Sequence, residues 1–255
     1  MLHCQNIPDV YTPGKMALWL LSAFKAGFIN SAGFLLTGKF VSHVTGFGTQ
    51  VGIAMGHSDY FFGTELLIIP LSFIGGGVIS SLILDNTNDN KIPSYHYVQG
   101  LITLLILVII VLGEKGFISA ALHFDDDQKY DFMEFSIIAI LCLICGLKNS
   151  LVTWTTYGKI RVTHLSGIST DIGLNLTKTL GLKSKNPRFN ENPIINLHRI
   201  ATLFSFSVGA FISAVMFPRF GHKSFYIVLT ISLLMTVLAF CARRETQERL
   251  IESYS

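Results

Sequence analysis

Six apolar stretches, each close to the length that crosses a lipid bilayer, constrain this chain more than any other feature of its sequence. A helix of about 20 apolar residues crosses a hydrocarbon core of about 30 Å. Half of the 255 residues are apolar and only 14% are charged, which is too little charge for a soluble domain. The stretches cover residues 16–36, 64–84, 98–113, 134–152, 197–217 and 225–241. The sequence therefore predicts an all-α, polytopic helical membrane protein.

A ten-residue motif occurs twice in the chain. It reads HVTGFGTQVG at 43–52 and HLSGISTDIG at 164–173. Two further blocks match in the same order, GFINS with GLKNS and SFIGGGVIS with SFSVGAFIS. Matching blocks in the same order are an internal repeat. The chain is therefore predicted to contain two homologous halves.

This repeat predicts five parts. They are an N-terminal tail at 1–15, a first membrane repeat at 16–113, an acidic connecting loop at 114–133, a second membrane repeat at 134–241 and a cytoplasmic C-terminal tail at 242–255. Lys and Arg gather in the loop before the fifth apolar stretch and in the C-terminal tail. By the positive-inside rule, these segments and the N-terminus are predicted to be cytoplasmic.

The segments that carry the ten-residue motif are short and polar for lipid-facing spans. The first, 41–56, contains His43, Thr45 and Thr49. A non-spanning helix is tolerated at membrane depth only where protein or a water-filled cavity surrounds it. We therefore expect six full spans plus two short broken or re-entrant helices, with eight spans as the alternative. Six spans would make the halves inverted in topology, and eight would make them parallel.

Each motif contains a hydroxyl residue before a glycine, Thr45 before Gly46 and Ser166 before Gly167. Ser and Thr are common N-cap residues because their side-chain oxygen accepts a bond from a free helical amide. A helix that starts at membrane depth points its positive end into the protein. We therefore expect these two helix starts to bind an anion or a polar group.

His43 and His164 stand two residues before these expected caps, and Thr49 and Thr170 lie four residues after them, on the same helical face. Polar rings that recur inside a membrane need partners, which favours a binding role. The alternative is structural: the small residues allow close helix packing, and each histidine satisfies a carbonyl left open by the helix break.

Charged residues within the apolar segments break the symmetry of the halves. Lys25 and Lys148 occupy different places in the matching blocks, and a buried lysine needs an acid or an anion. We predict that Lys148 pairs with Asp171, and that Arg161 supplies a second cation. The alternative for Lys25 is that its ammonium group snorkels to the membrane interface.

The predicted substrate-binding residues come from both motifs and the helix before the second. They are His43, Thr45, Gly46, Thr49, Lys148, Asn149, Arg161, His164, Ser166, Gly167, Thr170 and Asp171. Asn30 and Asn149 recur at matching positions and form a predicted structural pair.

Other chemistry has little support in the sequence. The motifs of covalent catalysts, zinc proteases and phosphate-binding loops are absent, so we expect no catalytic residue and no cofactor. Cys142 and Cys145 are read as packing residues, and the aspartates 125–127 as a solvated loop, so no metal is expected. The sequence contains no basic cluster interleaved with aromatic residues, so nucleic-acid binding is not expected.

Several motif blocks together resemble the YoaK-like family of bacterial multipass membrane proteins. They are GxxNSAGF from residue 27, SHVTG from 42, GLxNS from 146 and RxTHLSGxxTDxG from 161. The chain departs from the family at Lys148, where Gln is usual, and at Ser166, where Thr is usual. The resemblance covers nearly the whole chain. It implies a bacterial inner-membrane location and supplies no activity, because the family is a domain of unknown function.

The two motifs favour a secondary transporter or permease for a small polar or anionic solute, because transporters bind substrate where broken helices of two inverted halves meet. One alternative is a membrane enzyme that uses His43, His164 and Asp171. Another is a non-transporting scaffold or sensor that binds a soluble partner through loop 177–199. The expected partners are the lipid bilayer and a small polar solute, with a homo-oligomer left open.

Overall fold

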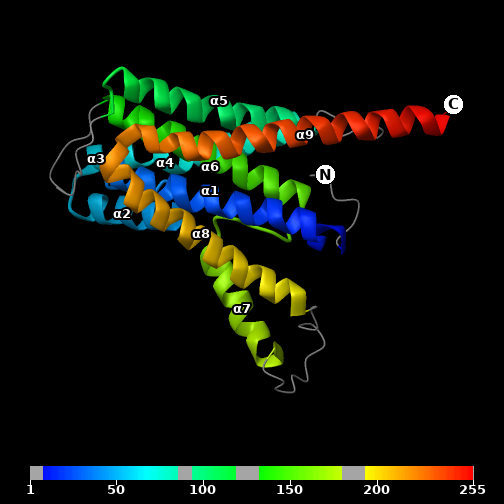
Figure 1. Cartoon of the computed structure of the whole chain (residues 1–255). Helices are drawn as coiled ribbons and strands as arrows, with labels where there is room; N and C mark the ends of the chain where they lie inside the picture. The colour runs from blue at the N-terminus through cyan, green and yellow to red at the C-terminus, as the bar shows by residue number, and fades with distance from the viewer. Residues whose placement is uncertain (1–7, 86–93, 119–131, 180–192, 255) are drawn as a thin grey trace.

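The computed structural model describes residues 8–85, 94–118, 132–179 and 193–254, and Figure 1 shows the whole chain. Within these ranges every regular element is a helix, which confirms the predicted all-α fold class. Cys4, the aspartates 125–127 and most of the basic loop lie outside the described residues.

Two short 3-10 helices, η1 (Pro8–Tyr11) and η3 (Gly221–Ser224), accompany the α-helices. The α-helices of the described residues are α1 (Pro13–Thr37), α2 (Val44–Gly56), α3 (Tyr60–Leu66), α4 (Ile68–Asp85), α5 (Tyr95–Glu114), α6 (Phe132–Thr155), α7 (Leu165–Thr179), α8 (Pro193–Phe220) and α9 (Phe225–Tyr254).

Five helical segments in the described residues are long and apolar enough to cross a membrane. They are Pro13–Thr37, Tyr60–Asp85, Tyr95–Glu114, Phe132–Thr155 and Ile194–Arg244. The last has 51 residues and contains most of α8 and α9. Helices of this length and composition are those of a membrane protein.

Two helices extend beyond the apolar stretches of the sequence. The first helix begins at Pro13 rather than at residue 16, because proline is well tolerated at the first helical position, where its missing N–H has no helical partner. The helix α9 continues without a break to Tyr254, through most of the segment 242–255 predicted as the C-terminal tail. The helix α1 ends at Thr37 and is followed by Gly38, whose φ of 67° suits a residue without a Cβ.

The bundle is built around two close helix pairs, α1 with α8 and α4 with α6. A Cβ atom added to Gly27 of α1 would collide with the carbonyl oxygen of Phe206 in α8. A Cβ on Gly146 of α6 would collide in the same way with the carbonyl oxygen of Phe73 in α4. The missing side chains let the helix backbones touch, which is how small residues promote packing in membranes.

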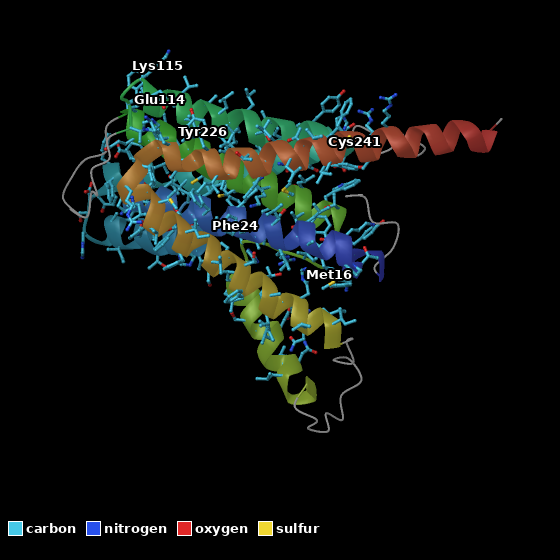
Figure 2. All side chains as sticks on the ribbon, in the orientation of Figure 1. Met16, Phe24, Glu114, Lys115, Tyr226 and Cys241 are labelled. Carbon is cyan, nitrogen blue, oxygen red and sulfur yellow. The ribbon has the colours of Figure 1, made fainter. Side chains whose placement is uncertain are left out.

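Helices α5 and α9 form a third pair on one side of the bundle (Figure 1). The hydroxyls of Thr103 and Thr236 lie 2.9 Å apart where the two helices meet. Figure 2 shows Glu114 at the end of the bundle where Tyr226 lies, opposite to Met16 and Cys241. The helices α5 and α9 are therefore antiparallel, and α1 begins at the end of the bundle toward which α9 runs.

Candidate functional site

The two asparagines predicted as a structural pair make corresponding contacts. The side-chain oxygen of Asn30 accepts hydrogen bonds from the backbone N–H and the hydroxyl of Ser42, at 3.0 and 2.8 Å. The side-chain oxygen of Asn149 accepts one from the hydroxyl of Thr163, at 3.1 Å. Each asparagine thus anchors the residue that precedes the motif histidine, which fixes the chain before it enters the short helix.

The predicted N-caps are wrong by two residues. The helix α2 begins at Val44 with His43 in the N-cap position and without a side-chain cap bond, and α7 begins at Leu165. The His43 carbonyl accepts a bond of 3.0 Å from the amide three residues later, so the first helical turn closes on the histidine. Thr45 and Ser166 therefore lie inside their helices.

The two helix starts differ in their surroundings. A Cβ on Gly46 would lie 2.8 Å from the imidazole Nδ1 of His43, whereas a Cβ on Gly167 would meet open space. In both helices the next threonine hydroxyl is bonded within its own helix. Thr49 and Thr170 donate to the backbone carbonyl four residues earlier, at 3.4 and 3.0 Å. Both threonines are exposed.

A cleft of about 310 Å³ borders the start of α7. It lies between α7, the first turns of α8, the segment that joins α6 to α7 and the residue Tyr11 of η1. Its lining residues are Tyr11, Gly158, Lys159, Ile160, Arg161, His164, Gly167, Ile168, Asp171, Ile195, His198, Arg199 and Thr202. Four of the predicted site residues, Arg161, His164, Gly167 and Asp171, are therefore brought together.

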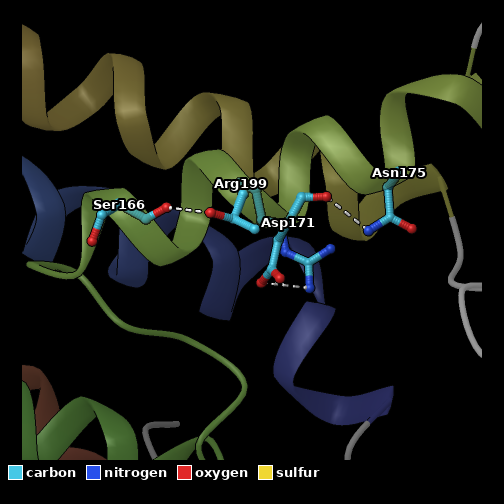
Figure 3. Close-up of polar contacts among 5 residues, drawn as sticks. Ser166, Asp171, Asn175 and Arg199 are labelled. Atoms are coloured by element: carbon cyan, nitrogen blue, oxygen red, sulfur yellow. Dashed lines mark hydrogen bonds and ion pairs between the residues drawn. The ribbon is translucent and has the colours of Figure 1, made fainter.

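Asp171 forms an ion pair with Arg199 of α8, at 3.2 Å (Figure 3). The predicted pairing of Asp171 with Lys148 is therefore wrong: Lys148 is buried within α6, and its Nζ makes no hydrogen bond to the described residues. The Asp171 carbonyl also accepts a bond of 2.9 Å from the Asn175 side chain. The carboxylate is thus held against α8 at the edge of the cleft.

The cleft is dominated by positive charge. Lys159, Arg161 and Arg199 are cationic, and Asp171 is the one carboxylate among its lining residues. Arg161 Nη1 lies 3.5 Å from the ring Nδ1 of His164, a long contact that leaves its other donors for further bonds. Cationic side chains that converge beside a helix start suit an anionic solute.

The site residues of the first motif lie elsewhere. The helix α2, which carries His43, Thr45 and Thr49, packs against α3 and α4, whereas α7 packs against α8. Figure 1 shows α2 at one end of the bundle, whereas α7 projects away from the bundle below α8. The structure therefore does not bring the first group of predicted residues to the cleft.

Sequence reasoning missed the cleft cations Lys159 and Arg199, and it also missed His198 and Thr202. His198 and Thr202 are buried in α8, and the Thr202 hydroxyl donates to the His198 carbonyl at 2.8 Å. Their four-residue spacing on an apolar helix is a signal that would have placed both on one face. In the part of the chain that the structure describes, no three His, Cys, Asp or Glu side chains lie close enough to hold a metal ion.

A family model described as "Protein of unknown function (DUF1275)" matches residues 18–238. The chain belongs to this family. The match spans both short helices and most of the cleft lining, and it confirms the family resemblance that the motif blocks predict. No curated protein and no solved structure matches the chain. For this DUF1275 member, function must therefore be argued from the site.

Proposed function

We propose that this chain is a secondary transporter or permease for a small anionic solute, in the bacterial inner membrane. The observation that carries the proposal is the cationic cleft at the start of α7, where three cations face one carboxylate. A short helix that starts beside such a cleft, next to helices long enough to span the membrane, has the composition of a transporter binding site.

The helix pairs support two inverted halves. Gly27 and Gly146 occupy matching places in the sequence repeat, as do their contacts Phe206 and Phe73. Each half thus supplies a glycine to the other half through the same kind of backbone contact. The first helix of each half packs against a later helix of the opposite half, as expected for two related halves that interlock.

The placement of the short helices supports six spans rather than eight. The helices α2 and α3 lie together at one end of the bundle, between the end of α1 and the start of α4 (Figure 1). The helix α7 joins the cleft near Tyr11, which precedes α1 at the opposite end. Two inverted halves are expected to place their short helices at opposite ends of the bundle. If α2 crossed the membrane, the next helix α3 would begin at the far end rather than beside α2.

This arrangement would place both termini and the cleft on the cytoplasmic side. The exposed cations Lys159 and Arg161 lie beside the cleft. Arg243 and Arg244 follow closely after Cys241 of α9, which lies at the same end of the bundle as Met16 (Figure 2). Under the positive-inside rule this end is cytoplasmic. A reporter protein that functions only in the cytoplasm should be active when it is fused after Tyr254. Activity of a reporter that functions only in the periplasm would overturn this orientation.

Competition between the Asp171 carboxylate and an anionic solute for Arg199 gives the cleft a way to bind and release that solute. The Asp171 side chain is about half exposed and competes with any anion for Arg199. A solute carboxylate or phosphate would displace Asp171 from the guanidinium group, which offers paired N–H donors to such groups. Occupied and empty sites would then differ in how α7 is held against α8.

Uptake into proteoliposomes tests the proposal. The wild-type chain is reconstituted and assayed with a panel of labelled small anions, amino acids and nucleobases. We expect uptake of an anionic member, reduced at least tenfold in Arg199→Gln and Arg161→Gln. Arg219→Gln, at the other end of α8, is the matched control and should retain uptake.

Variants of the two motif histidines distinguish a binding site in the cleft alone from a site shared by both motifs. If α7 alone forms the binding site, His164→Ala should impair uptake and His43→Ala should leave it nearly unchanged. Equal loss in both variants would support a site shared by the two motifs. Uptake that is unaffected by His164→Ala, Arg161→Gln and Arg199→Gln would contradict the assigned site, and no flux for any solute would contradict the transport function.

A further inference from the structure

Two lysines lie inside the helix bundle, away from the cleft. Lys25 is at the midpoint of α1 and is 1% exposed, and Lys148 of α6 is 3% exposed. The helices that carry them, α1 and α6, pack against each other, and like charges held within one low-dielectric interior repel. No carboxylate among the described residues acts on either of them. Buried ammonium groups are normally paired, because removing a charge from water is costly.

The neighbouring hydrogen-bond acceptors are already in use. The Ser232 hydroxyl oxygen accepts bonds from Lys25 Nζ at 2.6 Å and from Gln99 Nε2 at 3.1 Å. The Ser232 carbonyl accepts from the Thr236 hydroxyl at 2.8 Å and lies 3.4 Å from Gln99 Nε2. A single residue thus serves three donors from α1, α5 and α9.

Lys148 receives no acceptor from this group. Its Nζ is buried and makes no hydrogen bond to any described residue. A lysine ammonium group has three donors and no acceptor, so a second lysine such as Lys25 cannot satisfy it. The centre of the bundle therefore contains more donors than acceptors and an excess of positive charge, and Lys148 has no acceptor among the described residues.

We propose that Lys148 and Lys25 bind a small monovalent inorganic anion, for which chloride is the probe, at the centre of the bundle. An anion supplies what this cluster lacks: it accepts hydrogen bonds from Lys148 and offsets the repulsion between the two ammonium groups. The long, flexible lysine stem lets the Lys148 head adjust to the ion. The inference concerns binding alone and does not depend on transport.

This site differs from the cleft in its chemistry. The cleft contains a carboxylate, Asp171, already bound to Arg199, and it opens beside exposed residues. The central cluster combines two lysines with neutral polar groups, and it is closed off by the surrounding helices. Substitutions in one site are therefore expected to leave binding at the other intact.

Thermal unfolding of the purified chain in detergent tests the inference. Unfolding is followed in sodium chloride, in sodium nitrate and in sodium gluconate at equal ionic strength, since gluconate is too bulky for a buried site. Ligands that bind only the folded state raise its stability. We expect chloride or nitrate to raise the Tm by about 2–4 °C over gluconate, with saturation as the anion concentration increases.

Four variants locate the effect. Lys148→Gln, which keeps a polar donor and removes the charge, and Lys25→Gln should both lose the rise. Lys115→Gln, an exposed lysine beyond α5, and Arg199→Gln in the cleft should keep it. The proposal is overturned if the wild type shows no rise with either anion, if Lys148→Gln keeps the full rise, or if Arg199→Gln alone abolishes it. Lys148→Gln decides the matter if Lys25→Gln does not fold.

Discussion

The two copies of the ten-residue motif share an anchor and differ in what they face. In both, an asparagine holds the residue before the histidine, and the short helix begins directly after that histidine. The first copy then packs on α3 and α4, while the second borders a cleft that α8 lines with Arg199 and His198. In both copies the motif sets the local turn, and the neighbouring helix decides whether that turn borders a cleft.

The largest expected effect tests whether the two halves are built alike. Gly27→Val and Gly146→Val each place a side chain against a backbone carbonyl of the partner helix. Overpacking of this kind costs about 3 kcal/mol or more when backbone atoms must move. We expect both variants to lose folded protein to a similar extent, measured by size-exclusion chromatography in detergent.

Gly48→Val is the control for these variants, because a side chain there meets open space. It should change the stability only slightly, because valine meets no neighbour there and has a somewhat higher helix propensity than glycine. A normal yield for Gly146→Val beside a lost Gly27→Val would show that the two contacts are not equivalent.

The next effect separates the two anchors. Asn30 accepts two bonds from Ser42, and Asn149 accepts one from Thr163. Asn30→Ala also leaves a backbone amide without its partner, so it should destabilise the fold by about 1–3 kcal/mol, against about 0.5–1.5 kcal/mol for Asn149→Ala. Thermal unfolding in detergent measures the difference. A larger loss in Asn149→Ala would show that the second anchor supports more than its one bond.

A smaller effect, opposite in sign, distinguishes the helix starts. Gly167→Ala adds a methyl group in open space and should stabilise α7 by about 0.5–1 kcal/mol. Gly46→Ala pushes against the His43 ring and should lose that gain or destabilise α2. Both are compared with the wild type by thermal unfolding. An equal gain in the two variants would mean that the His43 ring moves aside freely.

The smallest effect on stability concerns the ion pair at the cleft. Because the Asp171 side chain is about half exposed, its pairing with Arg199 should contribute only about 0.2–1 kcal/mol. A double-mutant cycle with Asp171→Asn and Arg199→Gln, measured by unfolding at low and high salt, isolates this term. A coupling that does not weaken with salt would indicate a more buried pair than the structure shows.

Much of the fold follows from the sequence because the signals are local and repeated. Apolar stretches near 20 residues predicted the long helices, and the repeated GFINS and GLKNS blocks contain the glycines that touch the partner helices. Helix boundaries were less secure. The predicted N-cap at Thr45 was wrong because the first helical turn closes on the backbone carbonyl of His43. A hydroxyl residue before a glycine does not show which backbone carbonyl begins the helix.

Pairing between distant residues was the least predictable part of the site. Asp171 was expected to reach Lys148 and instead meets Arg199, because the sequence does not specify which helix lies beside α7. His198 and Thr202 were missed for the same reason. The repeat placed Lys25 and Lys148 out of alignment, yet the fold packs α1 against α6 and buries both lysines.

The sequence by itself determined that this chain is a helical membrane protein of the DUF1275 family with a recurring histidine motif, since composition, helix length and motif identity are properties of contiguous residues. The tertiary structure alone decided that the two motifs stand apart, that α8 completes a cationic cleft beside the second, and that Lys148 is buried without a hydrogen-bond partner among the described residues. Those features depend on which helices pack together, and that choice rests on backbone contacts between residues far apart in the chain.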